Sequence, residues 1–151
     1  MTDDNFKNIT VNRRAKHDYF ILQTFEAGIV LLGTEVKACR QGKAGLTDSY
    51  AVIKDGEVWL MSANIAVYEH GNINNHEPTR KRKLLLNKRE IRKLLHQTRE
   101  KGNTLVPLRM YFTRGKIKVE LAVARGKKSY DKRETIAKKD FQRSQERKIK
   151  F

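Results

Sequence analysis

The chain has 151 residues, which suits one domain with a single hydrophobic core. Its 33 lysine and arginine residues against 17 aspartate and glutamate residues give a formal net charge of +16, and such a field favours polyanions, nucleic acid before an anionic membrane surface. No apolar run approaches the ~20 residues of a spanning helix. The N-terminal MTDDNFKNIT does not resemble a signal peptide, and the single cysteine excludes an intramolecular disulfide and a multi-cysteine zinc site. We therefore expect a cytosolic chain without membrane contacts.

The first third of the chain is predicted to contain one strand and one helix. The strand covers Asp18 to Phe25, and Gly28 allows a bend after it. The candidates for burial in this strand are Tyr19, Ile21 and Phe25. The helix follows in GTEVKACRQGK, residues 33–43, with Thr34 as its N-cap and Gly42 placed to end it. Val36 and Cys39 share one face of this helix.

Two β-hairpins are predicted further along the chain. In YAVIKDGEVWLM the dipeptide Asp55-Gly56 separates two apolar runs, which is a strong hairpin signal. The alternating positions typical of half-buried strands are Tyr50, Val52, Val58 and Leu60. In LRMYFTRGKIKVELAVA the turn is Arg114-Gly115. The second strand of that hairpin has Ile117, Val119, Leu121 and Val123 on one side and Lys116, Lys118 and Glu120 on the other.

A loop and a second helix lie between the hairpins. The segment from Tyr68 to Lys83 is rich in Asn, Gly and charge, which predicts a mobile loop. The helix begins at Asn87 with Glu90 completing a capping box, and Gly102 provides its stop. Its apolar stripe is Ile91, Leu94 and Leu95. Short antiparallel strands, two helices and a basic surface predict a mainly β fold, an OB-like antiparallel barrel spanning residues 1–125.

No motif favours an enzyme, a metal site or a cofactor. The histidines lack metal-ligand spacing, and there is neither a Walker loop nor a G-x-G-x-x-G segment. His70 and His76 are expected to be solvated in the loop. Cys39 is expected to be a packed small hydrophobe rather than a nucleophile.

Two basic clusters are candidates for RNA contact. In NRRAKHDYF, three cations can hold phosphates and His17 can stack on a base or bond a ribose. The three cations are Arg13, Arg14 and Lys16. The alternative for them is a solvated N-terminal arm. The second cluster is TRKRK, which supplies Arg80, Lys81, Arg82 and Lys83, and charge runs of this kind have little specificity on a basic protein.

Seven segments of the chain, in order, resemble one protein family. They are NRRAKHDYF, FEAGIVLLGTEVKACRQGKA, DSYAVI, DGEVWL, ANI, PTRKRKLLLNKREI and GKKSYDKRETI. From Asn8 to the C-terminus the chain is similar to the SsrA-binding proteins, also called small protein B, which bind transfer-messenger RNA (tmRNA) in bacterial trans-translation. The family fold is an OB-like barrel with added helices and a C-terminal tail.

The resemblance implies a non-catalytic adaptor that acts as a monomer. It would hold the tRNA-like domain of tmRNA and deliver it, with elongation factor Tu and GTP, to a stalled ribosome. The family's RNA-contacting surface would include Asn12, Glu26 and Leu85. Asn12 can pair with a base or sugar edge, Glu26 can accept from a base amino group, and Leu85 can pack on an unstacked base. The residues by themselves would instead favour the barrel core for Leu85.

Residues 126–151 are predicted to form a basic tail outside the barrel. They contain ten lysine and arginine residues against four aspartate and glutamate residues, and few large apolar side chains. This composition predicts disorder in the free protein, while Asp131 as N-cap and Glu134 indicate a helix. The resemblance implies that this helix forms in the vacant mRNA channel, with 16S rRNA contacts at the decoding centre and Tyr130 stacking on a base. The tail residues expected to contact the ribosome are Gly126, Lys127, Lys128, Tyr130, Asp131, Lys132 and Arg133.

Two other functions stay open at this point. A ribosomal or general RNA-binding OB protein without a tmRNA role would share the charge and the fold. An RNA-processing enzyme would need a catalytic acid, histidine or cysteine, and the sequence offers no residue to nominate.

Overall fold

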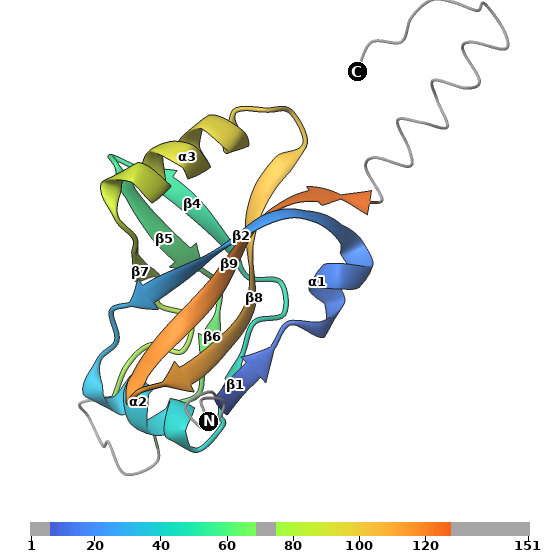
Figure 1. Cartoon of the computed structure of the whole chain (residues 1–151). Coiled ribbons are helices and arrows are strands. Elements are labelled where there is room, and N and C mark those ends of the chain that lie inside the picture. Colours follow the sequence, from blue (N-terminus) through green and yellow to red (C-terminus); the bar gives the residue numbers. More distant parts are fainter. Residues whose placement is uncertain (1–6, 69–74, 128–151) are drawn as a thin grey trace, which may run out of the picture.

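The computed structural model describes residues 7–68 and 75–127 (Figure 1). The predictions for His70 and for residues 128–151 therefore lie outside the described residues. Along the chain the elements are β1 (Lys7–Val11), α1 (Arg13–Asp18), β2 (Tyr19–Ile29), α2 (Gly33–Arg40), β3 (Ala44–Gly45), β4 (Tyr50–Lys54), β5 (Glu57–Met61), β6 (Asn64–Ile65), β7 (Arg82–Leu85), α3 (Lys88–Thr98), β8 (Asn103–Thr113) and β9 (Lys116–Gly126).

The main sheet closes on itself. Within the described residues its strand order is β1-β8-β4-β5-β7-β2-β9. An additional β8–β9 pairing closes the six strands from β8 to β9 into an antiparallel ring, and β1 is attached to β8 outside this ring. β8 pairs with β9 along one edge; along the other it meets β4 at Leu105 and β1 from Arg109 to Phe112. Closure leaves few unpaired strand edges. The prediction of a mainly β, antiparallel barrel is confirmed, whereas β1 and α1 are additions that the patterns did not reveal.

Both predicted hairpins form, and in each turn the two central residues have positive φ. Asp55 and Gly56 have φ of 54° and 77°, and Arg114 and Gly115 have 51° and 76°, as a two-residue type I′ turn requires. The buried side of β9 is confirmed, since Val119, Leu121 and Val123 are fully buried.

The buried side of β4 differs from the prediction. Residues directly opposite each other in an antiparallel pair share a face, and the register places Ala51 opposite Leu60 and Ile53 opposite Val58. The core side of β4 is therefore Ala51 and Ile53. Tyr50 and Val52 lie on the outside, 41% and 37% exposed, so their expected burial is wrong.

A bulge in β2 changes which side chains of the strand face the barrel core. The register shifts between Ile21 and Gln23, so Phe25 packs in the barrel core while Tyr19 and Ile21 pack in a second cluster outside it. The expected bend at Gly28 does not interrupt the strand, which continues to Ile29.

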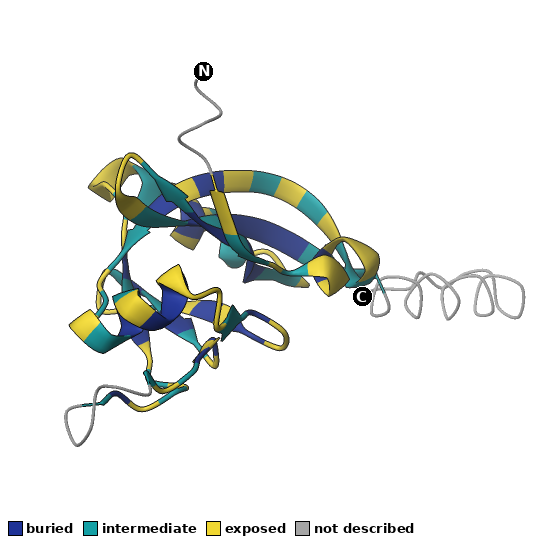
Figure 2. Cartoon of the chain, turned by 90° about the horizontal axis from the view of Figure 1, so that it is seen from below, coloured by how far each residue is buried: buried dark blue, intermediate teal, exposed yellow. Residues whose placement is uncertain are grey.

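The helices α2 and α3 lie at opposite ends of the barrel (Figure 1). Ala38 and Cys39 of α2 and Leu94 of α3 all enter the same core cluster, and buried residues line the interior between the strands (Figure 2). Burial raises the pKa of the Cys39 thiol to about 11, which agrees with the packed role expected for it. Leu95 is 39% exposed and does not share the buried stripe.

The caps of the two helices show one success and one error. In α3 the Glu90 amide donates to Asn87 Oδ1 at 2.8 Å and the Asn87 amide donates to Glu90 Oε1 at 3.1 Å, which confirms the capping box. In α2 the N-cap is Leu32, whose amide donates to Glu35 Oε1 at 2.7 Å. Thr34 is not the cap, because α2 begins at Gly33 and Thr34 lies inside its first turn, where its hydroxyl is paired with His76 Nδ1 at 2.9 Å.

The end of the predicted loop, residues 75–82, is held by hydrogen bonds. His76 is 6% exposed, and its Nε2–H donates to the Ile65 carbonyl at 2.8 Å while its Nδ1 accepts from Thr34. The expectation that His76 is solvated is therefore wrong. No helix in the described part of the chain is long and apolar enough to cross a membrane.

Candidate RNA-binding surface

The first basic cluster is carried by α1, which packs on the outside of the barrel. Ala15 is 2% exposed and lies in the outer cluster with Val106, Leu108 and Ala122 of β8 and β9. This anchor turns the neighbouring polar side chains outward, and the side chains of Arg14 and His17 are 69% and 88% exposed. The segment is thus a packed helix rather than a solvated arm.

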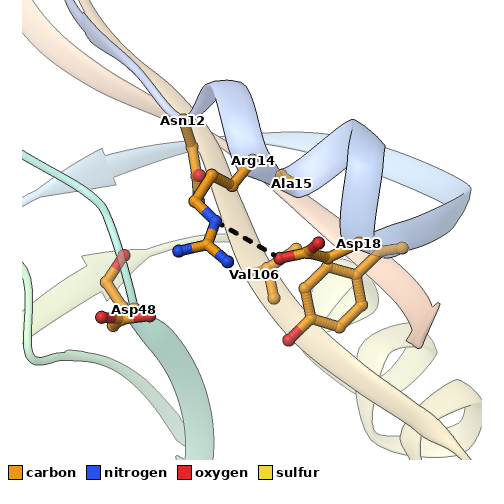
Figure 3. A pocket seen from close by; sticks show the side chains of 8 residues that line it. Asn12, Arg14, Ala15, Asp18, Asp48 and Val106 are labelled. Atoms are coloured by element: carbon orange, nitrogen blue, oxygen red, sulfur yellow. Dashed lines mark ion pairs between the residues drawn. The ribbon is translucent and has the colours of Figure 1, made fainter. Parts of the chain in front are cut away.

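Arg14 extends toward two carboxylates in a small pocket at the base of α1 (Figure 3). Its Nε lies 3.7 Å from Asp18 Oδ2, and Asp48 lines the same pocket. Arg13 and Lys16, on the other side of the helix, line a groove of about 490 Å³ together with Thr24 of β2. Cations therefore border α1 on both sides.

Asn12 ties the start of α1 to the barrel. Its Nδ2 donates to the Pro107 carbonyl at 2.9 Å and to the Leu46 carbonyl at 3.4 Å, and its backbone amide donates to the Leu108 carbonyl at 2.7 Å. Asn12 therefore positions α1, and its contact with RNA stays a prediction.

Glu26 lies on the outer face of β2 and is oriented by Tyr111. The Tyr111 hydroxyl donates to Glu26 Oε2, and burial together with this carboxylate raises the pKa of Tyr111 well above its ordinary value. Arg109 covers the Tyr111 ring at 4.1 Å from its centroid and donates to Glu120 Oε1 at 2.9 Å. The exposed carboxylate of Glu26 is thus held in one orientation by Tyr111 and its neighbours Arg109 and Glu120. The sequence motifs did not reveal this cluster.

Leu85 lies on the surface and not in the core. It is 50% exposed and sits opposite Gly28 of β2, where an added Cβ would lie 3.3 Å from Leu85 Cβ. The side chains of Arg82 and Leu84 point inward on β7, so Lys83 and Leu85 point outward. The core position favoured by the residues alone is wrong.

The second basic cluster is divided by the same alternation. Arg82 is fully buried, with Nε 2.8 Å from Glu35 Oε2 and Nη1 2.8 Å from the Ala63 carbonyl. The prediction that Arg82 contacts RNA is therefore wrong. Arg80 is partly exposed and donates to both oxygens of Glu35.

Glu35 is the buried charge that holds this cluster. Burial by itself raises the pKa of Glu35, but hydrogen bonds from Arg80, the Leu32 amide and Arg82 outweigh it and lower the pKa below its ordinary value of 4.5. The remaining cations of the cluster face outward: Lys81 Nζ lies 4.8 Å from the Trp59 ring centroid, and Lys83 Nζ lies 2.8 Å from Glu57 Oε2.

The described start of the predicted tail lies against α1. Gly126 is the last residue of β9 and pairs with Tyr19, so it belongs to the barrel. Lys127 Nζ donates to the Lys16 carbonyl at 3.0 Å and lies 5.3 Å from the Phe20 ring centroid. The other predicted ribosome-contacting residues, from Lys128 to Arg133, lie outside the described residues.

The comparisons with known proteins identify the family. The family model described as SmpB protein matches residues 9–151. The chain belongs to the SmpB family. It is similar to the SsrA-binding protein of Desulforudis audaxviator, at 58% identity over 91% of this chain and 90% of that protein, and to the SsrA-binding protein of Acetivibrio thermocellus, at 55% identity over 99% of this chain and 97% of that protein.

A solved structure agrees with this family assignment. A chain described as "tmRNA-SmpB: a journey to the center of the bacterial ribosome" matches with a TM-score of 0.70 and 53% identity, over 92% of this chain and 97% of that chain. The family resemblance and its barrel are thus confirmed. Both of these relatives are named for the binding of SsrA.

Proposed function

We propose that this chain binds the tRNA-like domain of tmRNA and delivers it, with elongation factor Tu and GTP, to stalled ribosomes for trans-translation. The observation that carries the proposal is the position of Glu26 and Leu85. They are far apart in sequence, yet both lie on the outside of the adjacent strands β2 and β7, on the barrel that carries α1. We call α1 with Glu26 and Leu85 the outer surface.

Each part of the outer surface suits a different part of an RNA. The cations of α1 suit phosphates, whose neutralisation supplies sequence-independent affinity. The Glu26 carboxylate has the wrong charge for a phosphate but can accept a hydrogen bond from a base amino group. The hydrogen bond from Tyr111 fixes the orientation of this carboxylate. Leu85 offers an apolar side chain to an unstacked base.

We assign the ribosome contacts to the tail, as a separate part of the same function. The barrel would hold tmRNA, while residues after Lys127 would enter the vacant mRNA channel and contact 16S rRNA at the decoding centre. The chain would act as a monomeric adaptor without a cofactor. The relatives' name supports the binding of tmRNA, and the ribosome in the matched structure's description supports a role at the ribosome.

A competition experiment tests the proposal. The labelled tRNA-like domain of tmRNA is bound to the protein, and unlabelled tRNA-like domain or an unrelated tRNA of similar size is added. We expect the unrelated tRNA to compete far more weakly. Equal competition by both RNAs would instead indicate a general RNA-binding barrel.

A further inference from the structure

The outside of β4 and β5 presents an apolar face that the outer surface does not include. The register aligns Val52 with Trp59 and Tyr50 with Met61, while the neighbours Val58 and Leu60 are fully buried. The alternation of the strands therefore directs Tyr50, Val52, Trp59 and Met61 outward. Tyr50 and Val52 are 41% and 37% exposed, and Trp59 is partly exposed.

Cations from β7 and its approach lie directly beside this face. Trp59 pairs with Lys83 across β5 and β7, and Lys81 Nζ lies 4.8 Å from the centroid of the indole ring. The side chain of Lys83 is 38% exposed. The only tryptophan of the chain is thus a partly exposed ring with Lys81 over it and Lys83 opposite it on the next strand, where the Lys83 ammonium is paired with Glu57 Oε2 at 2.8 Å.

This face is continuous with the outer surface. Leu85 follows Lys83 by two residues on the same side of β7, so one strand carries both. Lys83 in turn pairs with Trp59 on β5, so Leu85, Lys83 and Trp59 follow one another on the outside of the sheet.

We propose that the RNA held by the outer surface extends over β7 and β5, and that Trp59 stacks on one of its unpaired bases. Lys81 and Lys83 contact the phosphates on either side of that base. An aromatic ring flanked by cations is the pattern by which proteins hold single-stranded nucleic acid. The proposal rests on the proposed function, because it lengthens the same RNA-binding site.

The charges favour RNA over a protein partner on this face. Lysine is depleted at the centre of protein–protein interfaces, because burying its ammonium group costs desolvation free energy. Here one ammonium group lies over the largest ring of the patch. A phosphate beside a stacked base would keep that charge paired.

The emission of the single tryptophan tests the proposal without altering the protein. The full chain is titrated with a transcript of the tRNA-like domain, while fluorescence anisotropy of the labelled RNA reports binding independently. We expect the Trp59 emission to be quenched along the same binding curve. Binding by anisotropy with unchanged emission would overturn the stacking and leave the proposed function intact, whereas loss of both signals would count against the proposed function.

Two substitutions separate stacking from apolar contact. Trp59→Leu removes the π face and should weaken binding about 5- to 150-fold, while Trp59→Phe keeps a smaller ring and should lose less. Leu95→Ala is the control, since Leu95 is an exposed apolar residue on α3, outside the proposed site. Unchanged affinity for Trp59→Leu, or quenching seen only when a ribosomal protein or elongation factor Tu is added, would overturn the proposal.

Discussion

At the scale of single residues, neighbours in sequence have opposite roles on β7. Leu84 is 1% exposed and Leu85 is 50% exposed, although they are adjacent and chemically identical. Arg82 and Lys83 differ in the same way. A substitution in this strand therefore reports either on stability or on binding.

Leu85→Asp should weaken binding of the tRNA-like domain and leave the thermal midpoint nearly unchanged, because an added charge at that position stays in water. Leu84→Asp is the matched control and should destabilise the barrel by more than about 4 kcal/mol, since it buries an unpaired carboxylate. Thermal melts and RNA binding of both variants check this. A large fall in the melting temperature of Leu85→Asp would contradict the surface position of Leu85.

Glu35→Gln should destabilise the fold by about 3–5 kcal/mol at pH 7, because it leaves the buried guanidinium of Arg82 without its carboxylate. The pKa of Glu35 is lower in the folded chain than its ordinary value of 4.5, so the ion pair gives its full stabilisation above that value and loses it as the pH falls through the folded pKa.

Denaturant unfolding of both proteins at neutral and acidic pH measures this effect. The difference in unfolding free energy between the parent and Glu35→Gln should shrink as the pH is lowered below 4.5. A difference that stays constant from neutral to strongly acidic pH would show that the Glu35 charge does not stabilise the fold.

At the scale of elements, α1 is a short helix whose position depends on β8 and β9. Ala15 is its buried contact, and Asn12 connects it to the carbonyls of β8 and the loop before β4. The orientation of its cations is therefore a property of the barrel and not of the helix by itself.

Neutralising one cation of α1 at a time should reduce the salt dependence of RNA binding. Arg13→Gln, Arg14→Gln or Lys16→Gln should each flatten the log–log slope of affinity against salt by about 0.7–0.9 if that residue holds a phosphate. Lys93→Gln on α3 makes the same change of charge at an exposed position outside the outer surface and should leave the slope unchanged. Slopes that are identical in all four variants would contradict the electrostatic role of α1.

At the scale of the whole molecule, the barrel is complete only at the end of β9. Arg125 pairs with Phe20 and Asn103, and Gly126 pairs with Tyr19. The last residues of β9 are therefore still paired with the neighbouring strands. The predicted boundary between residues 125 and 126 thus falls inside a strand.

Truncation after Lys127 should spare binding of the tRNA-like domain and abolish tagging on stalled ribosomes, because it removes the proposed ribosome contacts and leaves the ring of strands intact. Truncation after Ala124 is the structural control and should lower the melting temperature, since it removes the last pairings of β9. Tagging in a purified translation system and thermal melts separate the two. Tagging at the full rate by the chain ending at Lys127 would contradict the division between barrel and tail.

The sequence by itself determined the features that depend on consecutive residues. The two turns, the Asn87–Glu90 cap, the basic charge and the family all follow from residues close together in the chain, because turn φ angles and caps are set locally.

Only the tertiary structure decided which members of each cluster face outward. In RKRKLLL the side chains alternate, but three consecutive leucines do not show which one faces the core, and the answer depends on how β7 pairs with β5 and β2. Arg82 of β7 is buried because it pairs with Glu35, which lies on the helix α2. Glu26 of β2 is oriented by Tyr111, which lies on β8. These contacts join residues far apart in the chain, so the burial that separates core from RNA-binding surface is set by closure of the barrel.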